Sequence, residues 1–201
     1  SSTAGYPQLT YTVPDDVITQ RDLLVSVPLL NQTKTSRNAD GKLPLRFRHA
    51  LSCIVFNAKM TDACDFPVKV TSITLGNFKN KATLSYDVSS TPGTFSWTMA
   101  GDASDKPYLL TINNGLLEDV NLKTITNTYQ SISTDNAFLM LLPQAIDETD
   151  EIKVTVEYQV TGNIQTQTIT VPLNRIISTL IAGQRYSINI LVSTLADLTL
   201  T

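Results

Sequence analysis

The chain has 201 residues, of which 42% are hydrophobic and 16% are charged, a composition typical of a globular protein. Its net charge of −3, with lysine and arginine scattered along the sequence, indicates no nucleic-acid partner. No apolar run approaches the roughly 18 residues of a membrane-spanning helix. The length suits one large all-β domain, or one domain with part of another.

The first forty residues contain two short strand candidates and a polar loop. Leu9–Val13 alternates briefly and ends at the turn sequence Pro14-Asp-Asp, and Asp22–Leu30 is apolar enough for a second strand. Asn31–Lys42 lacks large apolar residues, which is typical of an exposed loop. We therefore expect residues 1–40 to be a leading segment or the end of a preceding domain, and residues 41–201 to form one β-sandwich domain.

Leu43–Phe56 is predicted to be the central strand. One alternating face, from Leu45 to Val55, is apolar except for His49, which we expect to be a buried histidine rather than a catalytic one. The other face begins with two arginines and becomes apolar after Ser52, so the strand should enter from the rim and end covered on both sides. Because His49 is the only histidine, a site with several histidine ligands is excluded within one chain.

The middle of the chain predicts further short strands separated by turns. They are Val68–Leu75 (ended by Gly76-Asn77), Ala82–Val88, a short aromatic strand with Phe95 and Trp97, Tyr108–Ile112, and Ala137–Leu142 (apolar enough to be covered on both faces). Leu116–Ile132 shows no clear period and is expected to be mostly irregular.

The last third has the clearest alternation. It predicts a hairpin of Ile152–Val160 and Ile169–Leu173 around Gly162-Asn163, a short helical turn in Arg175–Leu180, a closing strand Tyr186–Val192 and a last strand Leu195–Thr201. Short strands with frequent turns and no long amphipathic helix predict an all-β fold, an antiparallel β-sandwich.

The sequence offers little catalytic chemistry. No phosphate loop or dinucleotide motif is present, so no cofactor is expected. The acidic stretches Gly101–Asp105 and Asp147–Glu151 are more typical of solvated turns than of calcium sites. Cys53 and Cys64 are either a disulfide in an exported protein or free thiols. Trp97 and Tyr108, beside Phe95, are either a sugar-stacking platform or core aromatics.

Four segments, in order along the chain, resemble motifs of the fimbrillin-like proteins of Bacteroidetes. They are Gln20-Arg-Asp-Leu-Leu-Val-Ser, Leu45-Arg-Phe-Arg-His-Ala-Leu-Ser, Leu139-Met-Leu-Leu-Pro-Gln and Ala182-Gly-Gln-Arg-Tyr-Ser-Ile-Asn-Ile-Leu. The resemblance implies a cell-surface pilin or pilus accessory subunit, without enzyme activity, built from transthyretin-like, Greek-key β-sandwiches. It implies an outer-membrane or fimbrial location and assembly by strand exchange with other pilus subunits or copies of itself. Membrane contact is expected only through a lipid anchor, for which no cysteine lies near Ser1.

Three segments are candidates for a donated or accepting strand, because an exposed sheet edge can pair with another chain. The residues are Leu9, Tyr11, Val13, Leu23, Val25, Val27, Leu195, Leu198 and Leu200. The alternative is that all three segments complete their own sheets. The rival function is a surface carbohydrate-binding module for a host or bacterial glycan, which exposure of Trp97 and Tyr108 would favour. A hydrolase accessory domain, the third reading, would need two facing carboxylates.

Overall fold

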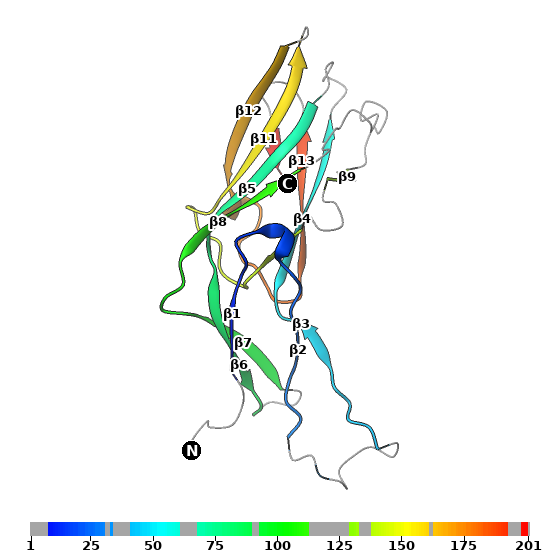
Figure 1. The fold of residues 1–201 in the computed structure, drawn as a ribbon, viewed down its shortest axis with the longest axis vertical. Coiled ribbons are helices and arrows are strands. Elements are labelled where there is room, and N and C mark those ends of the chain that lie inside the picture. The colour runs from blue at the N-terminus through cyan, green and yellow to red at the C-terminus, as the bar shows by residue number, and fades with distance from the viewer. Residues whose placement is uncertain are drawn as a thin grey trace.

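The computed structural model describes residues 8–30, 33, 41–60, 68–89, 93–112, 129–132, 138–160, 163–192 and 198–200. These residues form fourteen strands and two 3₁₀ turns, η1 (Val17–Thr19) and η2 (Leu173–Arg175), with no α-helix among them. No helix in this part of the chain is long and apolar enough to span a membrane. Figure 1 shows an elongated molecule with a large sandwich at one end and a smaller lobe at the other.

The large sandwich has two sheets. One has the order β12 (Asn163–Pro172), β11 (Glu151–Val160), β5 (Val68–Lys79), β8 (Asp105–Thr111). The other has the order β10 (Leu139–Leu141), β4 (Ser52–Met60), β13 (Arg185–Val192), β14 (Leu198–Leu200), with β9 (Gln130–Ser131) also on β4.

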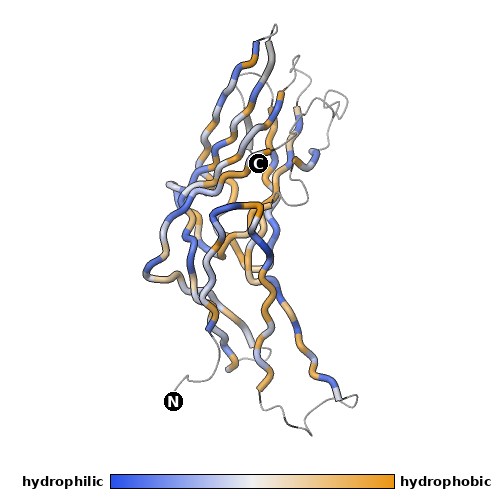
Figure 2. Tube along the Cα trace, in the orientation of Figure 1, coloured by the Kyte–Doolittle hydropathy of each residue, from blue (hydrophilic) through white to orange (hydrophobic). Residues whose placement is uncertain are grey.

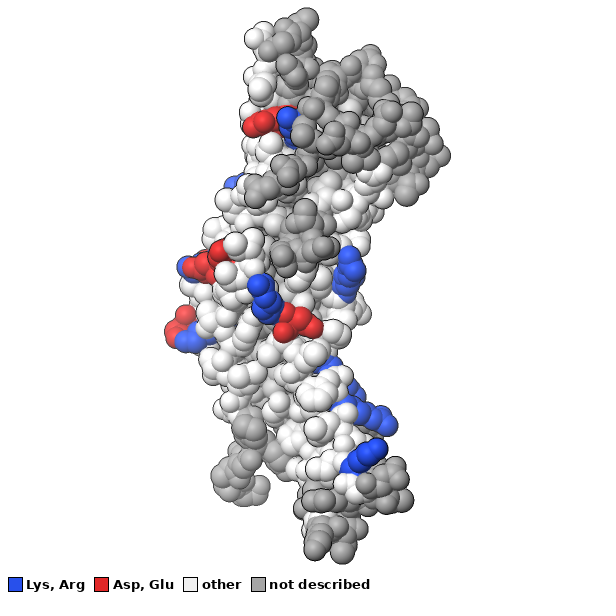
Figure 3. Space-filling model, turned by 45° about the vertical axis from the view of Figure 1, so that its right-hand side comes forward, with Lys and Arg blue, Asp and Glu red and all other residues white. Residues whose placement is uncertain are grey.

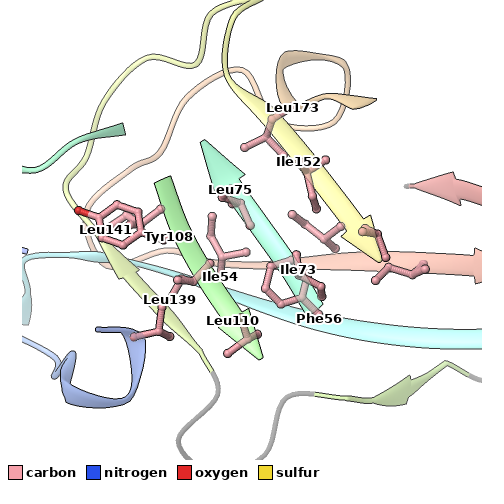
Figure 4. Close-up of a cluster of buried hydrophobic side chains, with 14 of the residues drawn as sticks. Ile54, Phe56, Ile73, Leu75, Tyr108, Leu110, Leu139, Leu141, Ile152 and Leu173 are labelled. Carbon is pink, nitrogen blue, oxygen red and sulfur yellow. The ribbon is translucent and has the colours of Figure 1, made fainter. Parts of the chain in front are cut away.

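Side chains from both sheets share one core (Figure 4). Ile54 and Phe56 of β4 and Ile73 and Leu75 of β5 are fully buried in it, together with Ile152 of β11. Burying each such side chain contributes about 1.5–3 kcal/mol. This end of the molecule therefore supplies most of the hydrophobic stabilisation.

The small lobe is built from a three-stranded and a two-stranded sheet. The first has the order β1 (Leu9–Thr12), β6 (Lys81–Asp87), β7 (Thr94–Met99), and the second pairs β2 (Leu24–Ser26) with β3 (Phe47–His49). Among the described residues, three buried side chains form its separate core cluster: Val25, Ala50 and Leu84.

Several predicted elements are confirmed. β11 and β12 form the expected hairpin, with Ile152 opposite Val171, and the closing strand is β13. β10 is buried at all three positions, as its apolar sequence predicts. The helical turn predicted over Arg175–Leu180 is not found there; the 3₁₀ turn η2 covers Leu173–Arg175 and overlaps the prediction only at Arg175. Cys64, Leu195 and most of Leu116–Ile132 lie outside the described residues.

The prediction of one continuous strand over Leu43–Phe56 is wrong. The chain passes from the small lobe to the large sandwich at Ala50-Leu51, so β3 pairs with β2 while β4 pairs with β10 and β13. Each side of the break therefore meets different neighbours. Phe47 is 61% exposed because no layer of the described residues covers the outer side of β3. His49 is exposed as well, so the expected buried histidine is also wrong.

Two further expectations about pairing are corrected. β13 runs parallel to β4, from Arg185 opposite Cys53 to Val192 opposite Met60, so the sandwich is not purely antiparallel. β5 does not end at Gly76 but continues to Lys79 through a register shift after Leu75. Asn77 adopts a left-handed φ of 67° there and donates from Nδ2 to the Thr149 carbonyl, so the turn-like sequence forms a bulge instead of an end.

Candidate interaction surfaces of the small lobe

The most exposed apolar surface lies on a projecting ribbon, which we define as residues 23–30 and 41–49. Of the eleven exposed large hydrophobic residues in the described part of the chain, six lie here: Leu24, Leu29, Leu30, Leu43, Leu45 and Phe47. Figure 2 shows hydrophobic segments along both legs of this ribbon at the lower end of the molecule. A concentration of exposed apolar side chains is typical of an interaction site.

The three-stranded sheet covers the ribbon only as far as Val27. Val25 faces that sheet and is buried. Val27 packs so closely against Gly93 that an added Cβ would lie 2.6 Å from Val27 Cγ1, so the contact requires glycine. Past Val27, Leu29 and Leu30 become exposed. The overhanging part of the ribbon therefore has no covering layer among the described residues.

Free strand edges border the small lobe. The Ala50 N–H donates to the Leu23 carbonyl, which sets the alternation along the β2–β3 pair. By that alternation the backbone of Arg48 bonds to Val25, whereas the N–H and C=O of Phe47 point to the opposite edge. On β7, the Ala100 N–H bonds to Lys81, so the backbone of Phe95 likewise points outward. No described strand pairs with either edge.

A groove of about 510 Å³ lies between these edges. It is lined by Phe47, Arg48, His49, Thr94, Phe95, Ala182 and Gly183. His49 is oriented by a 2.6 Å contact between its Nδ1 and Asp22 Oδ2, which leaves Nε2 as the free ring nitrogen. The residues that line the groove include two phenylalanines, an arginine, a histidine and a threonine, a mixture of apolar and polar residues typical of ligand pockets.

The two predicted ligand-binding aromatics do not lie in this groove. Tyr108 is fully buried in the large sandwich, and burial raises its pKa well above the usual range. Trp97 is half-buried, and its Nε1 donates to the Ala50 carbonyl at 2.7 Å. Trp97 and Tyr108 therefore do not form an exposed row, because the hairpin that carries Trp97 belongs to the small lobe and Tyr108 belongs to the large core.

The three strand-exchange candidates all pair within their own chain, at sheet edges. In the first, Leu9 is exposed, Tyr11 is half-buried and Val13 is buried; β1 pairs with β6 through Leu9 opposite Leu84. Leu23, Val25 and Val27 lie on or beside β2. Leu198 and Leu200 begin and end β14, which pairs with β13. Their exchange between subunits stays a prediction.

Several ionisable groups outside the ribbon form pairs. Asp105 and Asp102 contact Lys79 and Lys81, respectively. Asp147 accepts two hydrogen bonds from Thr149, which lower the pKa of its carboxyl group. Among the described residues no three His, Cys, Asp or Glu side chains gather as metal ligands. Cys53 is a free, half-buried thiol whose pKa is raised by burial.

The fimbrillin-like family profile matches residues 1–201, and the chain belongs to this family. The prediction from the four sequence motifs is thereby confirmed. The family is non-catalytic, which also confirms that the chain is not an enzyme, and it implies a cell-surface location. A search of curated proteins found no match.

Three solved structures of candidate cell adhesion proteins are similar. The protein from Bacteroides uniformis aligns with a TM-score of 0.56 at 19% identity, over 96% of this chain and 63% of its own. Those from Bacteroides ovatus and Bacteroides fragilis give TM-scores of 0.39 and 0.40 at 14% and 12% identity, covering 94% and 78% of this chain and 60% and 46% of their own. The first likeness supports the β fold, and the chain spans less than two thirds of each protein.

Sequence reasoning missed the groove, although one signal pointed to it. Arg46 and Arg48 alternate with Leu45 and Phe47, and all four side chains are exposed. The two arginines at the start of the predicted central strand indicated that the strand begins at the edge of the sandwich. They did not indicate that side chains on both of its faces would be exposed to solvent. Thr94 and Gly183 are distant in sequence, so only the fold brings them to β3.

Proposed function

We propose that the protein is a pilus subunit or accessory adhesin of the outer cell surface that joins neighbouring subunits by β-strand addition. The observation that carries the proposal is the apolar ribbon with free strand edges at one end of the molecule. An unpaired edge can hydrogen-bond a strand of another chain, while neighbouring apolar side chains bury against it. Within this proposal the sandwiches have the transthyretin-like, Greek-key arrangement that the family resemblance implies.

β1 is well suited to exchange between subunits. It contributes four residues, of which Leu9, Thr10 and Thr12 are exposed, so little buried surface is lost when it leaves its sheet. Its departure would free the edge of β6, where Leu84 and Ala82 pair with it. An equivalent strand from a neighbour would restore the same hydrogen bonds and the packing of Tyr11 on Trp97.

The first test is to express the protein in a Bacteroides host and to run sheared surface material on an SDS gel with and without boiling. A strand-exchanged polymer should give a ladder that collapses on boiling. Monomer alone in both lanes would overturn assembly by strand addition.

The ribbon's part in assembly is tested by a double substitution. Leu43→Lys with Leu45→Lys should shorten the ladder, because two charges replace exposed apolar contacts. The control is Ile164→Lys on β12, which is 71% exposed, against 44% and 54% for the two leucines, and lies on the large sandwich. An unchanged ladder in the double variant would show that the ribbon is not a subunit contact.

A further inference from the structure

We propose that the groove between β3 and β7 binds an acidic glycan, a chain of sugar units that carry carboxylate or sulfate groups. The groove residues are Phe47, Arg48, His49, Thr94, Phe95, Ala182 and Gly183. This proposal names the class of ligand that the proposed adhesin would bind. It does not depend on strand exchange, because a single subunit contains the whole groove.

The charge of this region is opposite to that of the protein. The ribbon carries Lys42, Arg46 and Arg48 and no acidic residue, a net charge of +3, although the whole chain has −3. The remainder of the molecule therefore carries −6. Figure 3 shows Lys and Arg atoms following one another over the lower part of one face, with no Asp or Glu atoms between them. A positive surface on an acidic protein favours an anionic ligand.

The two arginines are available to a ligand. Arg46 and Arg48 are exposed, and neither guanidinium has a partner among the described residues. Two described carboxylates of the small lobe are already engaged: Asp22 with His49, and Asp87, opposite Thr94, with Ser89. A guanidinium binds carboxylate or sulfate with two parallel hydrogen bonds, so Arg48 can hold the acidic group of a sugar.

The other groove residues suit a sugar ring. Phe47 is exposed and Phe95 is half-exposed, so the apolar C–H face of a sugar can pack on a phenyl ring. The His49 imidazole, held in place by Asp22, and the Thr94 hydroxyl can bond sugar hydroxyls. A volume of about 510 Å³ lies within the range of small-ligand pockets.

The geometry favours a compact ligand over a through-running β-strand. The Ala182–Gly183 turn lies against the end of β3, where Gly183 has a left-handed φ of 75° and an added Cβ would be 3.4 Å from the His49 carbonyl. The Gly183 N–H also bonds to Leu51. This turn covers the β3 edge at His49, so a paired strand would end there, whereas a sugar only needs the open pocket beside Phe47.

The experiment is calorimetric titration of the purified monomer with three hexasaccharides. Hyaluronan presents carboxylates, a heparin fragment presents sulfates as well, and neutral maltohexaose presents neither. Wild type should bind one or both acidic sugars at least tenfold more tightly than maltohexaose. The stronger of the two acidic sugars identifies the favoured anion.

Three substitutions locate the site. Arg48→Ala and Phe47→Ala should each weaken acidic-sugar binding at least fivefold, whereas Arg175→Ala, with the same charge change on the large sandwich, should alter it less than twofold. Phe47→Ala separates a built site from general charge attraction, because it removes no charge. Because Arg48 and Phe47 are both exposed, neither substitution should disturb the fold. The circular dichroism spectra of both variants should therefore match that of wild type.

Absence of acidic-sugar binding by wild type, or equal loss in Arg48→Ala and Arg175→Ala, would overturn the site. Unaltered binding by Phe47→Ala would also overturn it, since the attraction would then be nonspecific. The subunit ladder is a separate measurement. A ladder without sugar binding would reject the glycan site but not strand exchange. Sugar binding by a protein that stays monomeric would support the glycan site and reject strand exchange.

Discussion

The large sandwich and the small lobe bury their apolar residues to very different extents. The large sandwich has a continuous core between two sheets, with residues such as Phe56, Leu75 and Ile152 fully buried. The small lobe has a core cluster of three buried residues and many exposed apolar side chains on its ribbon. The first region is equipped to hold the fold, and the second presents surface for contacts with other molecules.

The contrast follows from the number of layers and strands around each segment. β4 pairs with three strands and packs against a second sheet. Among the described strands, β3 pairs with β2 alone. A two-stranded ribbon is marginally stable without further packing, so the β2–β3 pair depends on the few contacts that attach it to β6 and β7. Opening of the small lobe should therefore require less free energy than opening of the large sandwich.

The largest expected effect is the difference in stability between substitutions at two phenylalanines that are nine residues apart. Phe56→Ala should lower the free energy of unfolding by about 3–5 kcal/mol, because it leaves a cavity in the large core. Phe47→Ala should change it by less than about 0.5 kcal/mol, because this ring is exposed. Urea unfolding of both variants measures the difference. Similar losses in the two variants would contradict the division between core and contact surface.

An intermediate effect compares two fully buried leucines. Leu84→Ala in the small lobe and Leu75→Ala in the large sandwich should each cost about 2–5 kcal/mol locally. Hydrogen exchange should show faster exchange of β1, β6 and β7 amides in the Leu84 variant while β4 and β5 stay protected. In the Leu75 variant all these strands should lose protection together. Uniform exchange in both variants would mean that the two regions unfold as one unit.

The smallest effect compares the polar atoms of two aromatic residues. The Tyr108 hydroxyl is buried with no hydrogen-bond partner among the described residues, so Tyr108→Phe should stabilise the protein by about 1 kcal/mol. Trp97→Phe should destabilise it by about 1 kcal/mol, because it removes the donor to Ala50. Thermal unfolding should show shifts of opposite sign. A loss of stability in Tyr108→Phe would indicate that its hydroxyl is satisfied.

The family and most strand positions could be predicted from the sequence, because both depend on local information. Alternating Ile, Val and Tyr residues indicated the β11–β12 hairpin and β13, since a strand with one buried face repeats every two residues. The domain division at residue 40 stays a prediction. β1 and β2, from before that position, pair with β6 and β3 from after it.

The apolar alternation of Leu45, Phe47 and Leu51 was misleading. An alternating pattern indicates that one face of a strand is apolar, but it does not indicate whether another layer covers that face. Only the tertiary structure divides this stretch at Ala50-Leu51, so that Leu51 enters a core while Phe47 faces solvent. It also leaves Arg46 and Arg48 exposed on this ribbon and brings Thr94 and Gly183 beside Arg48. The sequence determined which segments become strands through local periodicity, whereas pairing between distant segments decided which apolar and charged side chains remain available to partners.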